Sequence, residues 1–173
     1  PTNGYNPSSP DSWGNEIKNW VSNTETEGGK RSKAFDFALK GAMNNVFGCT
    51  WFESNGSSNG SAASNNYALL ADNSNLYISQ PEDAVTFVDN HDTGSNQGHW
   101  ALTSDKVGAA YALILTHPGF PCVSWSHYFT FAESGSNEST YQHSHLTASS
   151  SYMGDKNVPG TTNTLRQHID KLI

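Results

Sequence analysis

The stretch Ala84-Val-Thr-Phe-Val-Asp-Asn-His-Asp-Thr93 decides the fold of this chain. Its first half is rich in β-branched and aromatic residues, which predicts a short buried strand over 84–88. A packed polar cluster of two carboxylates, an amide and an imidazole follows at 89–92, and then a loop begins at Gly94. Parallel α/β barrels carry their active-site residues on the loops that follow the strands. The cluster is therefore a candidate active site, although Asp89 and Asn90 also fit a turn in which these side chains bond their own backbone.

Strand and helix patterns alternate on both sides of this stretch. The spacing of apolar residues predicts strands and helices, in chain order, over 13–21 (helix), 34–37 (strand), 38–47 (helix), 104–117 (helix), 120–125 (strand) and 165–173 (helix). Ser104 is the expected N-cap of its helix.

The rest of the chain is expected to be irregular, with 1–32 mostly loop around one short helix and surface loops over 53–66 and 130–160. Strands that alternate with helices predict parallel βα units. A closed barrel needs about 250 residues, so the chain is either a small three-layer α/β domain or a piece of a larger barrel. The apolar stripe that still runs at Ile173 and the start at Pro1 favour the piece.

The composition limits the classes of partner. The formal net charge is −7, which argues against nucleic acid and anionic membranes because no basic patch is present. No run of 18 apolar residues predicts a transmembrane helix. Five Trp, seven Tyr and eight Phe in a chain rich in amides and hydroxyls suit a neutral polyhydroxylated ligand, although most of them are expected in the core. Sequons at Asn55, Asn59 and Asn137 fit a secreted glycoprotein, but a chain with this much Asn and Ser also produces them by chance.

Three other kinds of site have weaker support. Cys49 and Cys122 show no metal-binding spacing and are expected to be buried free thiols, with a disulfide as the open alternative. No Gly-x-Ser-x-Gly elbow for a serine hydrolase occurs. A zinc or copper site lacks a third ligand at good spacing, so we assign no metal ligand and expect solvated side chains for the histidines that would build it, His99, His117, His127, His143 and His145.

Several stretches resemble one known family in the same order along the chain. Phe87–Gly94 resembles the signature that ends barrel strand seven in the α-amylase family, glycoside hydrolase family 13. Residues 35–44 resemble strand and helix six, 111–122 resemble helix seven and strand eight of plant-type and maltotetraose-forming amylases, and 167–172 resemble helix eight. Trp125-Ser-His127 is similar to the maltotetraose-forming group.

The resemblance implies a fold and a domain division. The fold class is α/β, a partial TIM (β/α)8 barrel that covers about strands six to eight and their helices. Residues 1–173 are then the C-terminal part of one catalytic barrel, divided into a loop after strand five (1–32), unit six (33–47), unit seven (84–117) and strand eight with a long loop and the start of helix eight (120–173).

Site residues follow from the same resemblance. Asp92 matches the family's transition-state stabiliser, and His91 matches the histidine that binds the same sugar. Asn90, Trp100 and His127 are further candidates for substrate binding. The family's nucleophilic Asp and general-acid Glu precede strand six, and the Gly-x-Arg-x-Asp pattern of the nucleophile does not occur in this chain. Both are therefore expected upstream of the first residue.

The implied activity is endo-hydrolysis of α-1,4-glucosidic bonds in starch or glycogen with retention of configuration. The alternatives are a maltooligosaccharide-forming exo-amylase of the same family and a non-catalytic carbohydrate-binding protein, although binding modules are usually all-β. The resemblance also implies a secreted, monomeric enzyme with an α-glucan substrate. Calcium is expected in the full-length enzyme, with no ligands assigned in this chain.

Overall fold

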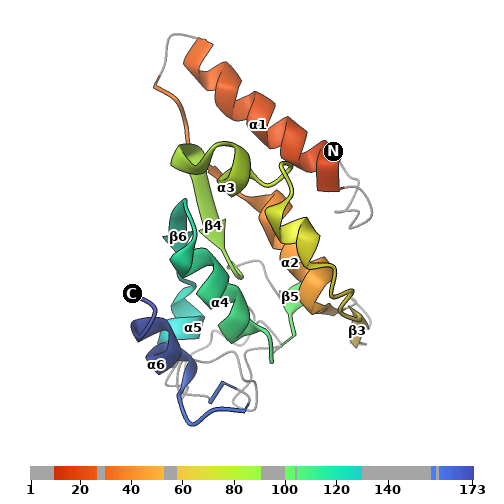
Figure 1. Ribbon diagram of the computed structural model, residues 1–173, viewed down its shortest axis with the longest axis vertical. Coiled ribbons are helices and arrows are strands. Elements are labelled where there is room, and N and C mark those ends of the chain that lie inside the picture. Colours follow the sequence, from red (N-terminus) through yellow and green to blue (C-terminus); the bar gives the residue numbers. More distant parts are fainter. Residues whose placement is uncertain are drawn as a thin grey trace, which may run out of the picture.

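The computed structural model describes residues 10–26, 30–52, 58–90, 100–103, 105–129, 157–158 and 160–173. Helices, two short 3-10 helices (η) and strands alternate along these residues (Figure 1). Their bounds are α1 (Pro10–Thr26), β1 (Ala34–Phe35), α2 (Phe37–Phe47), β2 (Cys49–Phe52), β3 (Ser58–Ser61), η1 (Tyr67–Ala71), α3 (Leu76–Ser79), η2 (Pro81–Asp83), β4 (Ala84–Phe87), β5 (Ala101–Leu102), α4 (Val107–Thr116), β6 (Phe120–Cys122), α5 (Trp125–Tyr128) and α6 (Leu165–Asp170).

A parallel sheet of three strands positions the site. The strand order is β1-β4-β6, so β4 pairs with one strand on each side. Ala34 lies opposite Ala84, and Phe87 lies opposite Cys122. Helix α2 follows β1, α4 follows β4 after the short strand β5, and α5 follows β6. Because all three strands are parallel, their carboxyl ends meet at one edge of the sheet. The α/β class with a parallel sheet is therefore confirmed.

Helix α2 begins one residue earlier than the sequence predicts. The strand ends at Phe35, and Asp36 is the N-cap, whose carboxylate accepts a hydrogen bond from the Leu39 amide at 3.0 Å. The same carboxylate accepts from the Tyr77 amide at 2.9 Å, which joins α2 to α3. Nearly the whole of α2 is buried, and it ends at Gly48, whose φ of 84° few other residues adopt.

Helix α4 starts later than expected. It begins at Val107, and the residue before it, Lys106, makes no side-chain cap. The prediction of Ser104 as N-cap is therefore wrong, because the helix starts three residues beyond it. The buried side of the helix includes Tyr111 and Ile114, both with at most 1% exposure.

The low-complexity segment 53–66 is not all loop. Residues Ser58–Ser61 form β3, which pairs antiparallel with β2, and β2 also pairs with β5. Backbone hydrogen bonds form this hairpin, and they need no apolar side chains. The sequence pattern therefore carried no sign of it.

The N-terminal segment also holds more structure than expected. Helix α1 covers 17 residues in place of the short helix at 13–21, so the description of 1–32 as mostly loop is wrong. Val21 is fully buried and Ile17 packs against the core. Gly14 allows the helix to approach α3 closely, because a Cβ there would lie 2.0 Å from the Ser74 carbonyl oxygen. The side of α1 that carries these residues faces α2 and α3 (Figure 1).

The last strand and the last helix are shorter than predicted. Strand β6 ends at Cys122, and Trp125, expected in this strand, begins helix α5. Helix α6 begins with a capping box between Thr164 and Gln167 and ends at Asp170, so it does not run to the last residue as its apolar stripe suggested.

Helix α6 packs against α4 and α5 in the lower part of Figure 1. The Tyr128 hydroxyl on α5 donates to the Asp170 carboxylate at 2.6 Å. The His168 side chain lies 3.0 Å from the Gly108 carbonyl of α4. Both cysteines are free thiols, and only Cys49 is buried, since Cys122 is exposed. Among the described helices, none has the length and apolar character needed to cross a membrane.

Candidate functional site

The predicted site residues fall into two groups. His91 and Asp92 lie outside the described residues. Asn90 and Trp100 are described, both half-buried, on either side of that segment. His127 lies on α5, the short helix that follows β6. The described part of the site therefore consists of the end of β4 and the elements that pack against it.

Asp89 is the first acidic residue after β4, and it is buried. Its side chain is 2% exposed and forms an ion pair and hydrogen bond with Lys40, a residue of α2 whose side chain is 9% exposed. A carboxylate removed from water needs such a partner, because an isolated buried charge is very costly. The pair therefore attaches the segment after β4 to the helix after β1.

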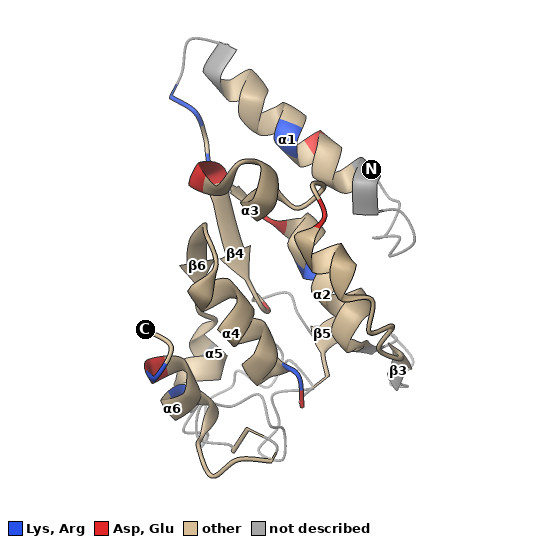
Figure 2. Cartoon of the chain, viewed as in Figure 1, with Lys and Arg blue, Asp and Glu red and all other residues tan. Residues whose placement is uncertain are grey.

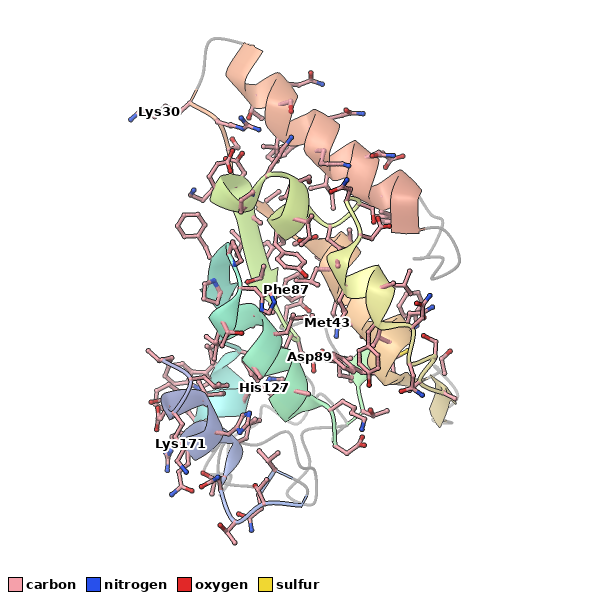
Figure 3. The ribbon with its side chains drawn as sticks, in the orientation of Figure 1. Lys30, Met43, Phe87, Asp89, His127 and Lys171 are labelled. Carbon is pink, nitrogen blue, oxygen red and sulfur yellow. The ribbon has the colours of Figure 1, made fainter. Side chains whose placement is uncertain are left out.

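His127 approaches the same carboxylate from the opposite side. Its Nε2 lies 3.7 Å from Oδ2 of Asp89, and the side chain is 1% exposed. Its Nδ1 lies 2.7 Å from the hydroxyl of Tyr111, which is fully buried on α4. The same hydroxyl accepts a hydrogen bond from the Ser124 amide at 3.2 Å. Figure 3 shows Asp89 and His127 near one another beyond the end of β4.

The charge states of these groups follow from their burial. Burial, and to a smaller degree the Lys40 charge, lowers the pKa of His127 to about 3, so its imidazole is neutral at pH 7. Burial raises the pKa of the Tyr111 hydroxyl, which therefore keeps its proton. Since the Tyr111 oxygen already accepts from Ser124, its proton is best used as a donor to Nδ1 of His127. The imidazole proton then lies on Nε2, on the side of Asp89.

We call these four residues, Lys40, Asp89, Tyr111 and His127, the buried polar network. It joins α2, the end of β4, α4 and α5, and so links all three βα units at the carboxyl edge of the sheet. One ammonium, one carboxylate, a neutral imidazole and a neutral phenol give it no net charge. Because these side chains are buried, the network can hold the four elements in place, but it offers almost no surface to a large ligand.

This arrangement changes the interpretation of His127. The sequence suggested it as a substrate contact, but its side chain is fully buried and its ring contacts Tyr111 and faces Asp89. Lys40 and Tyr111 were not recognised as polar site residues. Lys40 did carry a signal, because a lysine inside the apolar run of α2 is rarely buried without a charged partner. Tyr111 was assigned only to the apolar face of its helix.

Aromatic side chains are exposed at the same edge of the sheet. Trp125 and Phe129, one at the start of α5 and one just after it, have ring centroids 4.0 Å apart and are 62% and 40% exposed. They follow β6 and lie on the chain beside His127. Exposed aromatic faces suit the apolar C–H faces of sugar rings.

A separate apolar groove lies between α1 and β1. It has a volume of about 540 Å3, and half of its lining residues are aromatic, namely Trp13, Trp20, Phe35 and Phe37. Glu16 and Lys33 are its charged side chains, and none of the residues of the buried polar network lines it. A binding site normally adds convergent polar groups to an apolar lining, so the groove is a weaker candidate than the carboxyl edge.

The distribution of charge agrees with this choice of edge. Figure 2 shows that charged residues are sparse on the described ribbon, and neither α4 nor β6 carries one. Among the described residues, no group of three or more His, Cys, Asp or Glu side chains could hold a metal ion. The pair of Lys40 and Asp89 is the one ion pair among the described residues that joins a cationic and an acidic side chain each less than 10% exposed.

Comparison with known proteins gives a consistent set of relatives. No family model matches the chain. It is 37% identical over 128 residues to "Probable alpha-amylase 2" of Arabidopsis thaliana, a match that covers 72% of the chain and 26% of the relative. It is 40% identical over 124 residues to "Glucan 1,4-alpha-maltotetraohydrolase" of Roseateles saccharophilus, covering 68% of the chain and 18% of the relative. Over 49 residues it is 59% identical to "Alpha-amylase type B isozyme" of Hordeum vulgare, covering 28% of the chain and 32% of the relative. The chain thus spans about a third or less of the length of these relatives.

Proposed function

Since this chain is a homologue of the plant α-amylases and bacterial maltotetraohydrolases of glycoside hydrolase family 13, we propose that it is part of the catalytic barrel of an enzyme that hydrolyses α-1,4-glucosidic bonds in starch or glycogen. The parallel order β1-β4-β6 supports strands six, seven and eight of that barrel. An all-β carbohydrate-binding module does not fit a parallel sheet whose strands alternate with helices.

One observation carries the proposal more than the others. The buried polar network lies where the three parallel strands end, and Asp89 immediately precedes the stretch Asn90-His91-Asp92. In barrel enzymes this edge of the sheet bears the chemistry. An ion pair whose two side chains are both buried at this edge supports a defined position for the backbone at the end of β4.

In the proposed reaction Asp92 is the transition-state stabiliser. Its carboxylate binds hydroxyls of the sugar at the cleavage point, and His91 binds the same sugar. These bonds tighten as the ring distorts towards an oxocarbenium ion, and they lower the barrier by several kcal/mol. Asn90 and Trp100, both half-buried beside this segment, are proposed to line the substrate site.

Bond cleavage itself needs two further carboxylates. A retaining mechanism requires a nucleophile and a general acid about 5–5.5 Å apart. Asp89 is an unsuitable candidate, because it is buried and paired with Lys40. We propose that the nucleophilic Asp and the general-acid Glu belong to parts of the enzyme outside this sequence.

The enzyme could cleave the glucan within the chain (endo-cleavage) or from its ends (exo-cleavage). We favour endo-cleavage, in line with the names of the plant relatives, while the 40% identity to a maltotetraohydrolase supports release of a fixed oligosaccharide from chain ends. Product analysis decides between them. Endo-cleavage of amylose gives a mixture of lengths and rapid loss of iodine staining, whereas exo-cleavage gives almost only maltotetraose with slow loss of staining.

Three further properties are proposed from the family alone. They are secretion, a monomeric state and calcium binding in the full-length enzyme. The described residues contain no cluster that fits a calcium site, so none of them is proposed as a ligand. Loss of thermal stability on chelation of the full-length enzyme, reversed by added calcium, is the expected result.

Substitution of Asp92 tests the proposed function. In the full-length enzyme, Asp92→Asn is expected to lower kcat on soluble starch about 1000-fold, since each 1.36 kcal/mol of lost transition-state binding costs a factor of ten. The thermal unfolding midpoint should not change. Glu82→Gln, an exposed carboxylate before β4, is the matched control and should keep wild-type turnover. Near-wild-type hydrolysis by the Asp92 variant would refute the assignment.

A further inference from the structure

The buried polar network joins side chains that are distant in the sequence but meet at one point. Lys40 and Asp89 are 49 residues apart, and Tyr111 and His127 are 16 apart. Their elements belong to three successive βα units. Among the described residues, no other ion pair joins two side chains that are each less than 10% exposed, apart from the approach of His127 to the same Asp89.

The geometry restrains Asp89 through one strong bond and one packing contact. Lys40 holds Oδ1 from α2. Nε2 of His127, on α5, lies 3.7 Å from Oδ2, beyond hydrogen-bond distance, so the neutral imidazole packs against the carboxylate without bonding it. Tyr111 in turn fixes the imidazole through Nδ1, at 2.7 Å. The bond to Lys40 and the packed imidazole together limit the rotation of the Asp89 side chain, and with it the movement of the backbone at Asp89.

The energetics favour a positioning role over a stabilising one. A buried ion pair loses in desolvation about as much as it gains in attraction, so replacing it with apolar residues is often neutral for stability. Such a pair is weak support for folding but can define one conformation among several. Catalysis depends on such a defined conformation, because a misplacement of a catalytic group by about 1 Å can cost a factor of 100 in rate.

We propose that Asp89, Lys40 and His127 are positioning residues that hold the segment after β4 in place, so that Asp92 and His91 meet the sugar at the cleavage point. This rests on the proposed function of Asp92. None of the three contacts the substrate, and each acts through the backbone that follows Asp89.

The other end of the same strand offers a matched control. Asp83, at the amino end of β4, is also buried and pairs with Arg31, whose Nε lies 2.6 Å from Oδ2. Arg31 comes from the segment before β1, just as Lys40 comes from the helix after it. The pair of Arg31 and Asp83 is thus a buried carboxylate with a cationic partner from the same βα unit, but at the end of the strand that is distant from Asp92.

The test uses two double variants of the full-length enzyme. Lys40→Met with Asp89→Asn removes both charges at the carboxyl end, so that no charge is left buried alone, and Arg31→Met with Asp83→Asn does the same at the amino end. We expect the first variant to lower kcat on a maltooligosaccharide of defined length at least tenfold, with KM changed less than threefold. We expect the second to keep kcat within twofold. The thermal unfolding midpoints of both are measured alongside.

The single variant Asp89→Asn separates positioning from folding. It leaves Lys40 buried without its partner, so it should be less stable than the first double variant, in which stability recovers. If kcat stays low in the double variant although its stability has recovered, the positioning role holds. If kcat returns together with stability, or if both double variants lower kcat equally, the inference is overturned. A wild-type enzyme without activity on α-glucans would instead overturn the proposed function of Asp92.

Discussion

The two ends of β4 differ in how they treat a buried carboxylate. At the amino end, Asp83 pairs with Arg31, whose side chain is 31% exposed. At the carboxyl end, Asp89 pairs with Lys40, which is almost fully buried, and faces His127. One carboxylate therefore has a partner that water can reach, whereas the other has a buried cationic partner and a neutral imidazole packed against it.

The difference shows which end of the strand needs a defined position. A partner that reaches solvent can rearrange at little cost, whereas a buried network has one arrangement that satisfies its members. In parallel barrels the amino ends of the strands serve stability and the carboxyl ends serve chemistry. The two carboxylates, six residues apart and on either side of one short strand, fit this division.

Removal of the cation alone should give the largest effect and sharpen the comparison. Lys40→Met leaves Asp89 buried without a compensating charge, which should lower the free energy of unfolding of the full-length enzyme by about 3–5 kcal/mol. Arg31→Met should cost about 1–2 kcal/mol, because water can replace a partly exposed partner. Chemical denaturation of both variants measures the difference. Equal losses at the two ends would contradict the comparison.

The decrease in the free energy of unfolding at acid pH should depend on His127, which lies at the carboxyl end of β4. The unfolded chain protonates His127 below about pH 6.5, whereas the folded protein does so only near pH 3. Between these values unfolding takes up a proton, so the free energy of unfolding should fall by about 1.4 kcal/mol for each pH unit as the pH decreases. His127→Gln should remove this part of the slope.

The wild-type protein provides the reference for that experiment. Unfolding midpoints between pH 4 and pH 7 give both slopes. An unchanged slope in the His127 variant would show that the imidazole is accessible to protons in the folded state.

A backbone change at the amino end should affect stability but not turnover. Gly119 precedes β6 with a φ of 118°, and a Cβ there would lie 3.2 Å from Thr86 Cγ2 and 3.3 Å from the Ala84 carbonyl oxygen. Gly119→Ala should therefore cost about 1–3 kcal/mol. Gly160→Ala, at a φ of 77° with open space around it, should cost less. If the Gly119 variant is as well folded as the wild-type protein but has a lower kcat, the division of stability and chemistry between the two ends of the strands is wrong.

Loss of one hydroxyl from the buried polar network should give the smallest effect. Tyr111→Phe removes the group that bonds His127 and accepts from the Ser124 amide. The expected cost is about 1 kcal/mol. Tyr128→Phe, which removes the exposed hydroxyl bonded to Asp170, should cost less still. A larger loss in the Tyr128 variant would show that burial does not determine the value of these bonds.

Local patterns were sufficient where the apolar periodicity was strong. The strand at β4 and the buried faces of α2 and α4 were predictable, because apolar residues recur there at strand and helix spacing. The hairpin of β2 and β3 was not, since Ser, Asn and Gly form its second strand and only backbone pairing holds it. The full length of α1 was missed because its polar residues hide the helical pattern. For the site, His91 and Asp92 stay predictions from a motif.

The sequence by itself determined the alternation of strands and helices, the resemblance to the α-amylase family, and the polar cluster that follows β4, because each of these depends on residues close together in the chain. Only the tertiary structure decided what surrounds that cluster. It brought Lys40 to Asp89 across 49 residues and turned His127 from a candidate substrate contact into a buried neighbour of Asp89. The physical reason is that burial and charge pairing depend on which elements pack together, and apolar spacing within one element does not specify its partner.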